Sequence, residues 1–359
     1  MNESGRLGRV RVDLDRLRLE LLLITHLPNV RYLCGFTGSS GVLAISKRQA
    51  VLFTDGRYTE QARQEVTGAT VRIIRQPSLI GAGEWLARRR TPRRVGIEAA
   101  YLTVAERNRL ARLTGPGKRL VETQSLIEDL RLIKDSDEIA RIRAACHVGV
   151  DLFRRALNTI RSGISESQVA GELEFEARKA GIEQMAFPTI VASGERSALP
   201  HGRASAALIP AKGFVVCDFG VILAGYCSDM TRTVHVGRPQ TEARRVYEAI
   251  SEAQQAALEA VKPGTTVGEV DQAARRLLHK RHLGRYFTHS TGHGVGLEIH
   301  EAPRLAAGRK ELLRPGMVIT IEPGVYVPGK HGVRIEDTVV VTETGCEILT
   351  PCPKNLIEL

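Results

Sequence analysis

Two aspartates, Asp218 and Asp229, stand in a segment of otherwise mainly apolar or β-branched residues, FVVCDFGVILAGYCSDMTRTVHV. This pattern predicts two strands joined by a tight turn near Leu223 and Ala224. In that register the numbers of facing residues sum to 447, so Asp218 and Asp229 face each other directly. Like charges across a buried hairpin are destabilising unless a cation lies between them. The alternative, that one aspartate sits solvated at a strand end, stays open for this hairpin taken alone.

Two glutamates occupy similar apolar surroundings further along the chain. The segment MVITIEPGVYV places Glu322 on an apolar strand that Pro-Gly ends, and GVRIEDTVVV places Glu336 in the middle of another strand. Residues two apart on a strand share a face, so Arg334 lies on the face of Glu336. By the same spacing, Thr231 shares a face with Asp229. We expect Arg334 and Thr231 to hold and orient the carboxylates.

A histidine completes the set of residues that can bind metal. The segment TGHGVGLEIHEAP carries His293 between two glycines, which let a ligand approach the backbone closely, and His300 beyond it. A single histidine would usually be an ordinary core residue. Four carboxylates and one imidazole, however, suit two divalent cations, because oxygen ligands fit manganese, magnesium or cobalt and an imidazole favours transition metals.

The elements that must position these side chains form an internal repeat. Residues 163–169 (GISESQV) align with residues 264–270 (GTTVGEV) at a constant offset of 101. In both copies a hydroxyl residue precedes Gln or Glu by three positions, which is the capping-box spacing that opens a helix. We expect these helices to end at Gly181 and Gly284. The sequence therefore predicts two related halves.

The length of 359 residues predicts two domains. Residues 30–58 read as strands joined by tight turns, and alternating helices and strands follow, which indicates a small α/β unit. From residue 126 to about residue 161 the pattern becomes helical. We expect an N-terminal domain at residues 1–128 and a catalytic domain at residues 129–359.

Composition limits the possible partners. The 51 Lys and Arg against 40 Asp and Glu give a net charge of +11, but the basic residues are scattered and aromatic residues are only 4%. This disfavours nucleic-acid binding. No 18-residue apolar run and no secretory leader pattern is present, so we expect neither a membrane span nor export. Six cysteines without a CxxC pair favour reduced thiols and a cytoplasmic location.

At this point the sequence resembles a known family. Five residues in a fixed order match the ligand signature of metallopeptidases with the creatinase and methionine aminopeptidase fold: Asp218, Asp229, His293, Glu322 and Glu336. Within that family the segments VRYLCGFTGSSG, TDGRY and HSTGHGVGLEIHEAP are similar to those of the Xaa-Pro peptidases, the prolidases and aminopeptidases P. The resemblance covers nearly the whole chain. It implies an α+β protein: a C-terminal pita-bread catalytic domain with pseudo-two-fold symmetry, preceded by a smaller α/β creatinase-type domain.

The resemblance also implies a role for each metal ligand. Asp218 would bind one metal, and Asp229 and Glu336 would bridge two divalent ions. His293 and Glu322 would complete the second site. Manganese is the expected metal, with cobalt or zinc as alternatives. Because every ligand position is intact, the metal-free creatinases are disfavoured.

Further residues receive roles in the same way. Glu322 would also carry protons, and His201 and His300 would stabilise the developing oxyanion. The remaining candidates for substrate binding or ligand orientation are His289, Tyr326, Arg334 and Thr231.

The expected function is hydrolysis of the Xaa-Pro bond at the N-terminus of dipeptides or short peptides by a homodimeric enzyme. Whether the enzyme is a dipeptidase or an aminopeptidase P stays open. Two rivals remain: a methionine or general aminopeptidase, and a basic binder of nucleic acid or ribosomes that reuses the fold.

Overall fold

The computed structural model describes residues 3–359, which divide into two compact units. The first ends at Arg131 and the second spans Leu132–Leu359. The boundary expected after residue 128 falls inside a helix, α6 (Leu126–Arg131). Among the described residues, no helix is both long and apolar enough to cross a bilayer.

The first unit is an α/β domain built on a mixed sheet in the strand order β4-β3-β2-β1-β5-β6. Its strands are β1 (Leu21–Ile24), β2 (Val42–Ser46), β3 (Ala50–Asp55), β4 (Thr70–Ile74), β5 (Arg94–Glu98) and β6 (Arg119–Thr123). Besides α6, its helices are α1 (Glu3–Arg16), α2 (Leu27–Cys34), α3 (Thr59–Glu65), α4 (Ser78–Ala87) and α5 (Val104–Thr114), with a short 3-10 helix at Gly56–Tyr58. Strands and helices alternate after β3, as predicted.

The start of this unit departs from the prediction. Residues 30–34 form the last turns of α2 and not a strand. Short apolar runs do not separate helix from buried strand, and the Pro at the start of α2 favours the helix. Gly35 ends α2 with φ 81° and therefore belongs to a helix cap and not to a hairpin turn.

The second unit combines four long helices with several short sheets. Within residues 132–359 the helices are α7 (Ser136–Ala156), α8 (Glu166–Lys179), α9 (Thr241–Ala260) and α10 (Val267–Lys280), with 3-10 turns at Gly194–Ala198 and Gly284–Tyr286. In the first half the strands are β7 (Gln184–Met185), β8 (Ile190–Ser193), β9 (Gly213–Phe219), β10 (Val221–Leu223), β11 (Tyr226–Cys227) and β12 (Met230–Val236). In the second half they are β13 (Gly292–Gly294), β14 (Glu301–Leu305), β15 (Val318–Ile321), β16 (Gly324–Val327), β17 (His331–Arg334), β18 (Asp337–Val341) and β19 (Cys346–Ile348).

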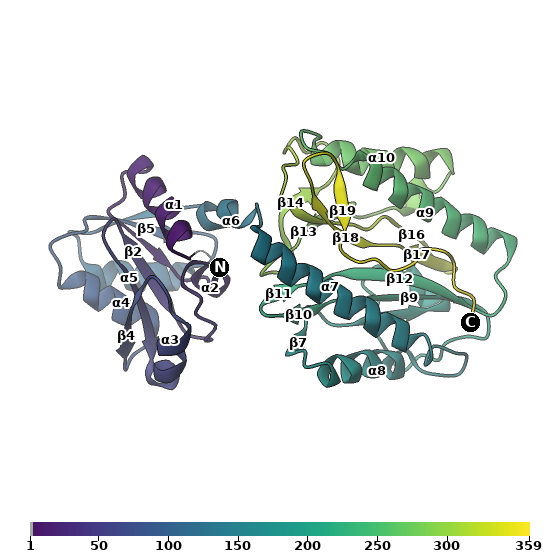
Figure 1. The fold of residues 1–359 in the computed structure, drawn as a ribbon, viewed down its shortest axis with the longest axis horizontal. Helices are drawn as coiled ribbons and strands as arrows, with labels where there is room; N and C mark the ends of the chain where they lie inside the picture. The colour runs from purple at the N-terminus through teal and green to yellow at the C-terminus, as the bar shows by residue number, and fades with distance from the viewer. Residues whose placement is uncertain (1–2) are drawn as a thin grey trace. The chain divides into compact units, whose positions relative to one another are not determined.

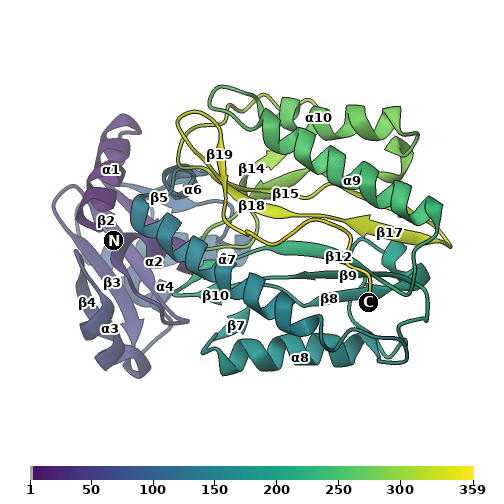
Figure 2. The ribbon, with the colours of Figure 1, turned by 45° about the vertical axis from the view of Figure 1, so that its right-hand side comes forward.

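The internal repeat is confirmed. Helix α7 packs on α8 and α9 packs on α10, and the two pairs lie along different sides of the strands (Figure 1, Figure 2). Helices α8 and α10 have the same length and start 101 residues apart, each with a complete capping box. The expected end of α10 at Gly284 is wrong. His282, which is 101 residues after Gly181, takes the left-handed conformation that Gly181 takes after α8.

The hairpin that carries both aspartates differs from the prediction in register. Strand β9 pairs with β12 so that Asp218 faces Thr231, and the turn lies one residue later than expected, at Ala224 and Gly225. Asp229 is therefore diagonal to Asp218, but a shift of two positions leaves both side chains on the same face. The hairpin also breaks at Gly220, where an added Cβ would lie 1.8 Å from the Ser228 carbonyl oxygen.

Candidate active site

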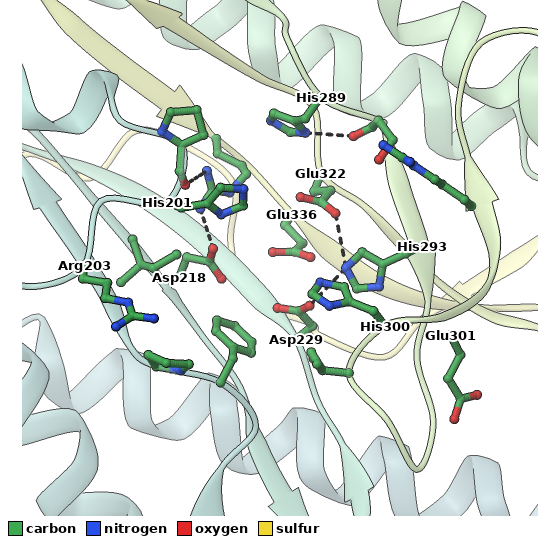
Figure 3. A pocket seen from close by; sticks show the side chains of 18 residues that line it. His201, Arg203, Asp218, Asp229, His289, His293, His300, Glu301, Glu322 and Glu336 are labelled. Atoms are coloured by element: carbon green, nitrogen blue, oxygen red, sulfur yellow. Dashed lines mark hydrogen bonds and ion pairs between the residues drawn. The ribbon is translucent and has the colours of Figure 1, made fainter. Parts of the chain in front are cut away.

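The predicted residues converge on one cavity of about 610 Å³ in the second unit (Figure 3). Nine of the candidate residues line it: His201, Asp218, Asp229, His289, His293, His300, Glu322, Arg334 and Glu336. The other two candidates, Thr231 and Tyr326, do not line the cavity, but each hydrogen-bonds to residues that do.

Strand ends deliver the five predicted metal ligands. Asp218 lies near the end of β9, Asp229 directly precedes β12, and His293 is on β13. Glu322 directly follows β15. Glu336 is not in the middle of a strand as expected, because GVRIEDTVVV divides between β17, which pairs with β16, and β18, which pairs with β15.

Thr231 and Arg334 hold the carboxylates as the sequence predicts. The Thr231 hydroxyl donates to Glu336 Oε2 at 2.6 Å and accepts from Arg334 Nε at 3.1 Å. Arg334 also donates to Asp218 Oδ2, and to the Tyr326 hydroxyl at 2.5 Å. One buried guanidinium therefore orients ligands from two different strands.

The imidazole of His293 has the orientation of a metal ligand. Its Nδ1 lies 3.0 Å from the Gly294 carbonyl oxygen, which fixes the ring with a proton on Nδ1. The lone pair of Nε2 then points toward Glu322 Oε1 at 3.4 Å and Asp229 Oδ2 at 3.5 Å. Donor atoms of Asp229, His293 and Glu336 all lie within 4.8 Å of one another.

The electrostatics of these carboxylates fit bound cations. Burial, with repulsion from Glu336 and Asp218, raises the pKa of Asp229 well above its ordinary value. Burial and repulsion from Glu322 likewise raise the pKa of Glu336, and burial raises the pKa of Glu322 to about 7. Arg334 supplies one positive charge against four carboxylates. Divalent cations would relieve this repulsion, and the oxygen-rich donor set with one imidazole suits a transition metal.

Three further histidines surround the carboxylates. Burial lowers the pKa of His289 to about 4, and its Nε2 lies 3.0 Å from the Tyr326 hydroxyl, so the ring is neutral. His300 stands edge-on to His293, with ring centroids 4.4 Å apart. Figure 3 shows His201 and His300 on different sides of the carboxylates. Both residues are exposed and line the cavity.

A second buried arginine, Arg232, holds the segments that carry the predicted ligands, from the face of β12 opposite Thr231. Arg232 follows Thr231 on β12 and therefore points to the other face. Its guanidinium donates to Asp337 Oδ1 at 2.7 Å, to the Glu336 carbonyl oxygen at 2.5 Å and to the Cys352 carbonyl oxygen at 2.7 Å. Residues near Cys352 are thus tied to the backbone that carries Glu336.

Sequence reasoning missed several residues of the cavity wall. Arg203, Glu301 and Arg304 line the cavity, as do the apolar Phe187 and Pro188. Arg203 stands two residues after His201, and Arg304 directly follows the HEAP segment, so proximity to predicted histidines was an available signal for both. No comparable signal marks Phe187 and Pro188.

Comparisons with known proteins agree with this geometry. Residues 140–343 match the model of metallopeptidase family M24, and residues 6–133 match that of the creatinase/prolidase N-terminal domain. An Xaa-Pro dipeptidase from Pyrococcus horikoshii is 38% identical over 96% of both chains. Among solved structures, an Xaa-Pro dipeptidase from Bacillus anthracis is 40% identical with a TM-score of 0.96, covering all of both chains. An X-Pro aminopeptidase from Thermotoga maritima is 36% identical with a TM-score of 0.90, covering 96% of this chain and 99% of its own.

Proposed function

The chain belongs to metallopeptidase family M24, and from that premise we propose that it is a metal-dependent exopeptidase that cleaves the bond between an N-terminal residue and a following proline. The observation that carries the proposal is the meeting of all five intact ligand residues in one cavity. The similar proteins named as Xaa-Pro dipeptidase and X-Pro aminopeptidase support the substrate class. A binder of nucleic acid would have no use for three buried carboxylates and a fourth that is half-buried beside them.

The ligands would hold two divalent ions, for which manganese is our proposal. Asp218 would bind one ion and His293 the other, with Asp229 and Glu336 between them. Glu322 would complete the site beside His293. Two such ions lower the pKa of water and polarise the scissile carbonyl.

The remaining side chains would act on the peptide directly. His201 and His300 would donate hydrogen bonds to the carbonyl oxygen as it gains negative charge. Glu322, whose Oε1 lies 3.4 Å from His293 Nε2, would pass a proton from the attacking water to the leaving nitrogen. The neutral His289, fixed by Tyr326, would form a wall of the proline pocket.

The cavity wall supports a preference for dipeptides over longer peptides. Arg203 and Arg304 line the cavity and can pair with a free C-terminal carboxylate. In an Xaa-Pro dipeptide that carboxylate is close to the scissile bond, whereas a longer peptide carries an uncharged amide there. Arg304→Ala should therefore lower kcat/KM for Ala-Pro more than for Ala-Pro-Ala.

Hydrolysis by metal-stripped protein tests the main proposal. The protein is resupplied with manganese, cobalt or zinc and given Ala-Pro, Ala-Pro-Ala and Ala-Ala. Replacing proline by alanine adds a buried N–H without a partner, which costs ~1–3 kcal/mol, and loses ring contact at roughly 25 cal/mol per Å². We expect Ala-Pro to be cleaved at least ~10²-fold better than Ala-Ala. Equal rates would leave the fold and the metals in place but make a general or methionine-directed aminopeptidase the better assignment.

We also propose a homodimer in the cytoplasm. The six cysteines are free thiols, which supports a reducing compartment. Sedimentation of the full chain measures the oligomeric state. A soluble variant lacking residues 1–124 should be monomeric and less selective for short substrates, and a truncated dimer with unchanged selectivity would contradict this.

A further inference from the structure

An ion pair in the second unit has no place among the metal ligands or substrate histidines. Lys134 Nζ lies 3.1 Å from Glu301 Oε2, with side chains only 2% and 8% exposed. Lys134 precedes α7, whereas Glu301 lines the active-site cavity and directly follows His300. Burying a charged pair carries a large desolvation cost, which favourable geometry and further hydrogen bonds must offset.

The Glu301 carboxylate is enclosed by the loop that connects His293 to His300. Its Oε1 accepts from the Glu298 backbone N–H at 3.1 Å. A Cβ added at Gly296 would lie 2.5 Å from Oε2, so the loop backbone folds tightly around the carboxylate. The loop therefore takes its shape from the position of Glu301.

Lys134 is held on a fixed part of the unit. Its backbone N–H donates to the Gly316 carbonyl oxygen at 2.9 Å, on the segment that leads into β15. Nearby, the Tyr226 hydroxyl donates to Glu138 Oε1 at 2.8 Å, which ties the first turn of α7 to β11. Both Tyr226 and Glu138 are buried. The ammonium of Lys134 thus reaches Glu301 from a backbone that is hydrogen-bonded to the segment before β15.

We propose that Lys134 and Glu301 are positioning residues that set the orientation of His300 toward the substrate. Figure 3 shows Glu301 away from the carboxylate cluster, with His300 between Glu301 and the cluster. Because His300 and Glu301 are adjacent, fixing the Glu301 side chain fixes the backbone from which the exposed His300 ring extends. The catalytic part of this inference rests on the proposed function, whereas the orientation of the ring does not.

The test uses the full chain with Lys134→Met, which keeps the length of the side chain and removes its charge. We expect kcat on Ala-Pro to fall about 10- to 100-fold, the range typical of residues that orient functional groups, with KM and the content of two metals unchanged. The matched control is Lys330→Met, which breaks the exposed pair of Lys330 with Glu242. The control should leave kcat unchanged.

Combination with His300→Ala separates positioning from general destabilisation. If Lys134 acts through His300, Lys134→Met adds no further loss of kcat in the His300→Ala background. An equal loss in both backgrounds, a loss of metal, or an unchanged kcat in the single variant would overturn the proposal. Should Lys134→Met fail to fold, Glu301→Gln replaces it, because the amide keeps the shape and still accepts from Glu298.

A second readout does not depend on peptidase activity. The imidazole C–H resonance of His300, assigned by its absence in His300→Ala, should shift or broaden in Lys134→Met and stay unchanged in Lys330→Met. A wild-type chain without peptidase activity would reject the proposed function alone. An unchanged resonance in Lys134→Met would reject the positioning role alone.

Discussion

The two halves of the second unit share a scaffold but contribute different chemistry. The first half provides Asp218 and Asp229 from one broken hairpin, β9 to β12. The second half provides an imidazole and two glutamates from the ends of three separate strands. Matching helices with matching caps therefore do not require matching ligands. The repeat is seen in the helices and their caps, whereas the residue at each strand end determines the donor atom.

Each half also anchors its cavity wall through a buried acid at a different position of the repeat. In the first half Glu166 accepts from the Ser193 N–H at 2.8 Å and pairs with Arg196 at 3.0 Å. In the second half Asp271 accepts from the Thr291 N–H at 3.1 Å and pairs with Arg275 at 2.7 Å. Both acids are fully buried.

The two arginines of these anchors then hold parts of the cavity wall. Arg196 donates to the Arg203 carbonyl oxygen at 2.9 Å, and Arg275 donates to the His289 carbonyl oxygen at 2.5 Å. Each half thus holds part of the cavity wall through a buried acid and an arginine, although the two acids do not occupy equivalent positions of the repeat.

The largest effect should come from removing one ligand of either half. Asp229→Asn and Glu336→Gln should each lower kcat/KM by more than ~10³-fold, well beyond the ~10- to 100-fold typical of residues that only orient ligands, because loss of a bridging charge leaves cation repulsion uncompensated. Kinetics and metal analysis of both variants check this. Wild-type turnover with two metals in Asp229→Asn would show that the halves do not share the ions.

The next effect concerns the histidine that each half contributes beside the proposed metal site. His201→Ala and His300→Ala should each lower kcat roughly 10²-fold, as removal of one oxyanion donor does in other enzymes. Both variants should keep two metals per chain. Metal loss in either variant would mean that the substituted histidine is a metal ligand. The two histidines would then not have equivalent roles in the two halves.

Removing an anchor charge should mainly lower stability. Glu166→Gln and Asp271→Asn each leave an arginine with a partly buried unpaired charge, which costs up to about 3–5 kcal/mol and lowers Tm by roughly 2–4 °C per kcal/mol. Arg275 is 26% exposed and Arg196 is 35% exposed, so Asp271→Asn should lower Tm more. Calorimetry against the surface control Glu242→Gln tests this ranking. The opposite order would mean that burial of the arginine does not set the cost.

A final effect is a pH dependence of the metal-free protein, in which carboxylates of the two halves repel one another. Burial raises the pKa values of Asp229, Glu322 and Glu336, so the folded chain keeps protons that the unfolded chain releases. Burial lowers the pKa values of His289 and His293, so these two groups make the folded chain more stable as the pH rises. This contribution is confined to pH values below about 6.5, where histidines of the unfolded chain are protonated. Between about pH 6.5 and 8 stability should therefore fall, by up to about 1.4 kcal/mol per pH unit for each retained proton.

Thermal unfolding of the stripped protein across that pH range measures the fall. Added manganese should remove most of it, because bound cations keep the carboxylates ionised in the folded chain. A Tm that rises with pH in the stripped protein would contradict the assignment of raised pKa values.

Local signals made much of this fold predictable. The capping boxes at Ser165 and Thr266 involve residues three apart, so the sequence reveals them directly. The register of β9 and β12 was not predictable in this way, because the turn lies at Ala224 and Gly225, and a turn one residue later shifts every facing pair by two positions. His282 shows a further limit, since a non-glycine residue adopts the left-handed conformation there despite its intrinsic cost.

The candidate site likewise combines residues that local sequence patterns reveal with contacts that they do not reveal. Clustered carboxylates on apolar strands were visible because unpaired charge in a core demands an explanation. The pairing of Lys134 with Glu301 joins residues 167 positions apart, and no local pattern reports such a contact. Arg304 stands close to His300 in the sequence, but its position opposite His293 depends on the pairing of β13 with β14.

The hydrogen bond from Arg232 to the Cys352 carbonyl oxygen joins residues that the ribosome adds at very different times. A ribosome adds residues from the N-terminus onward, so Asp218 and Asp229 emerge long before Glu336 and Cys352. At ~5–20 residues per second, the roughly 120 residues from Asp229 to Cys352 take about 6 to 24 s to translate. During that interval the nascent chain carries its two aspartates without the glutamates that would share cations with them. The site that would hold the metals is consequently among the last parts of the second unit to be completed.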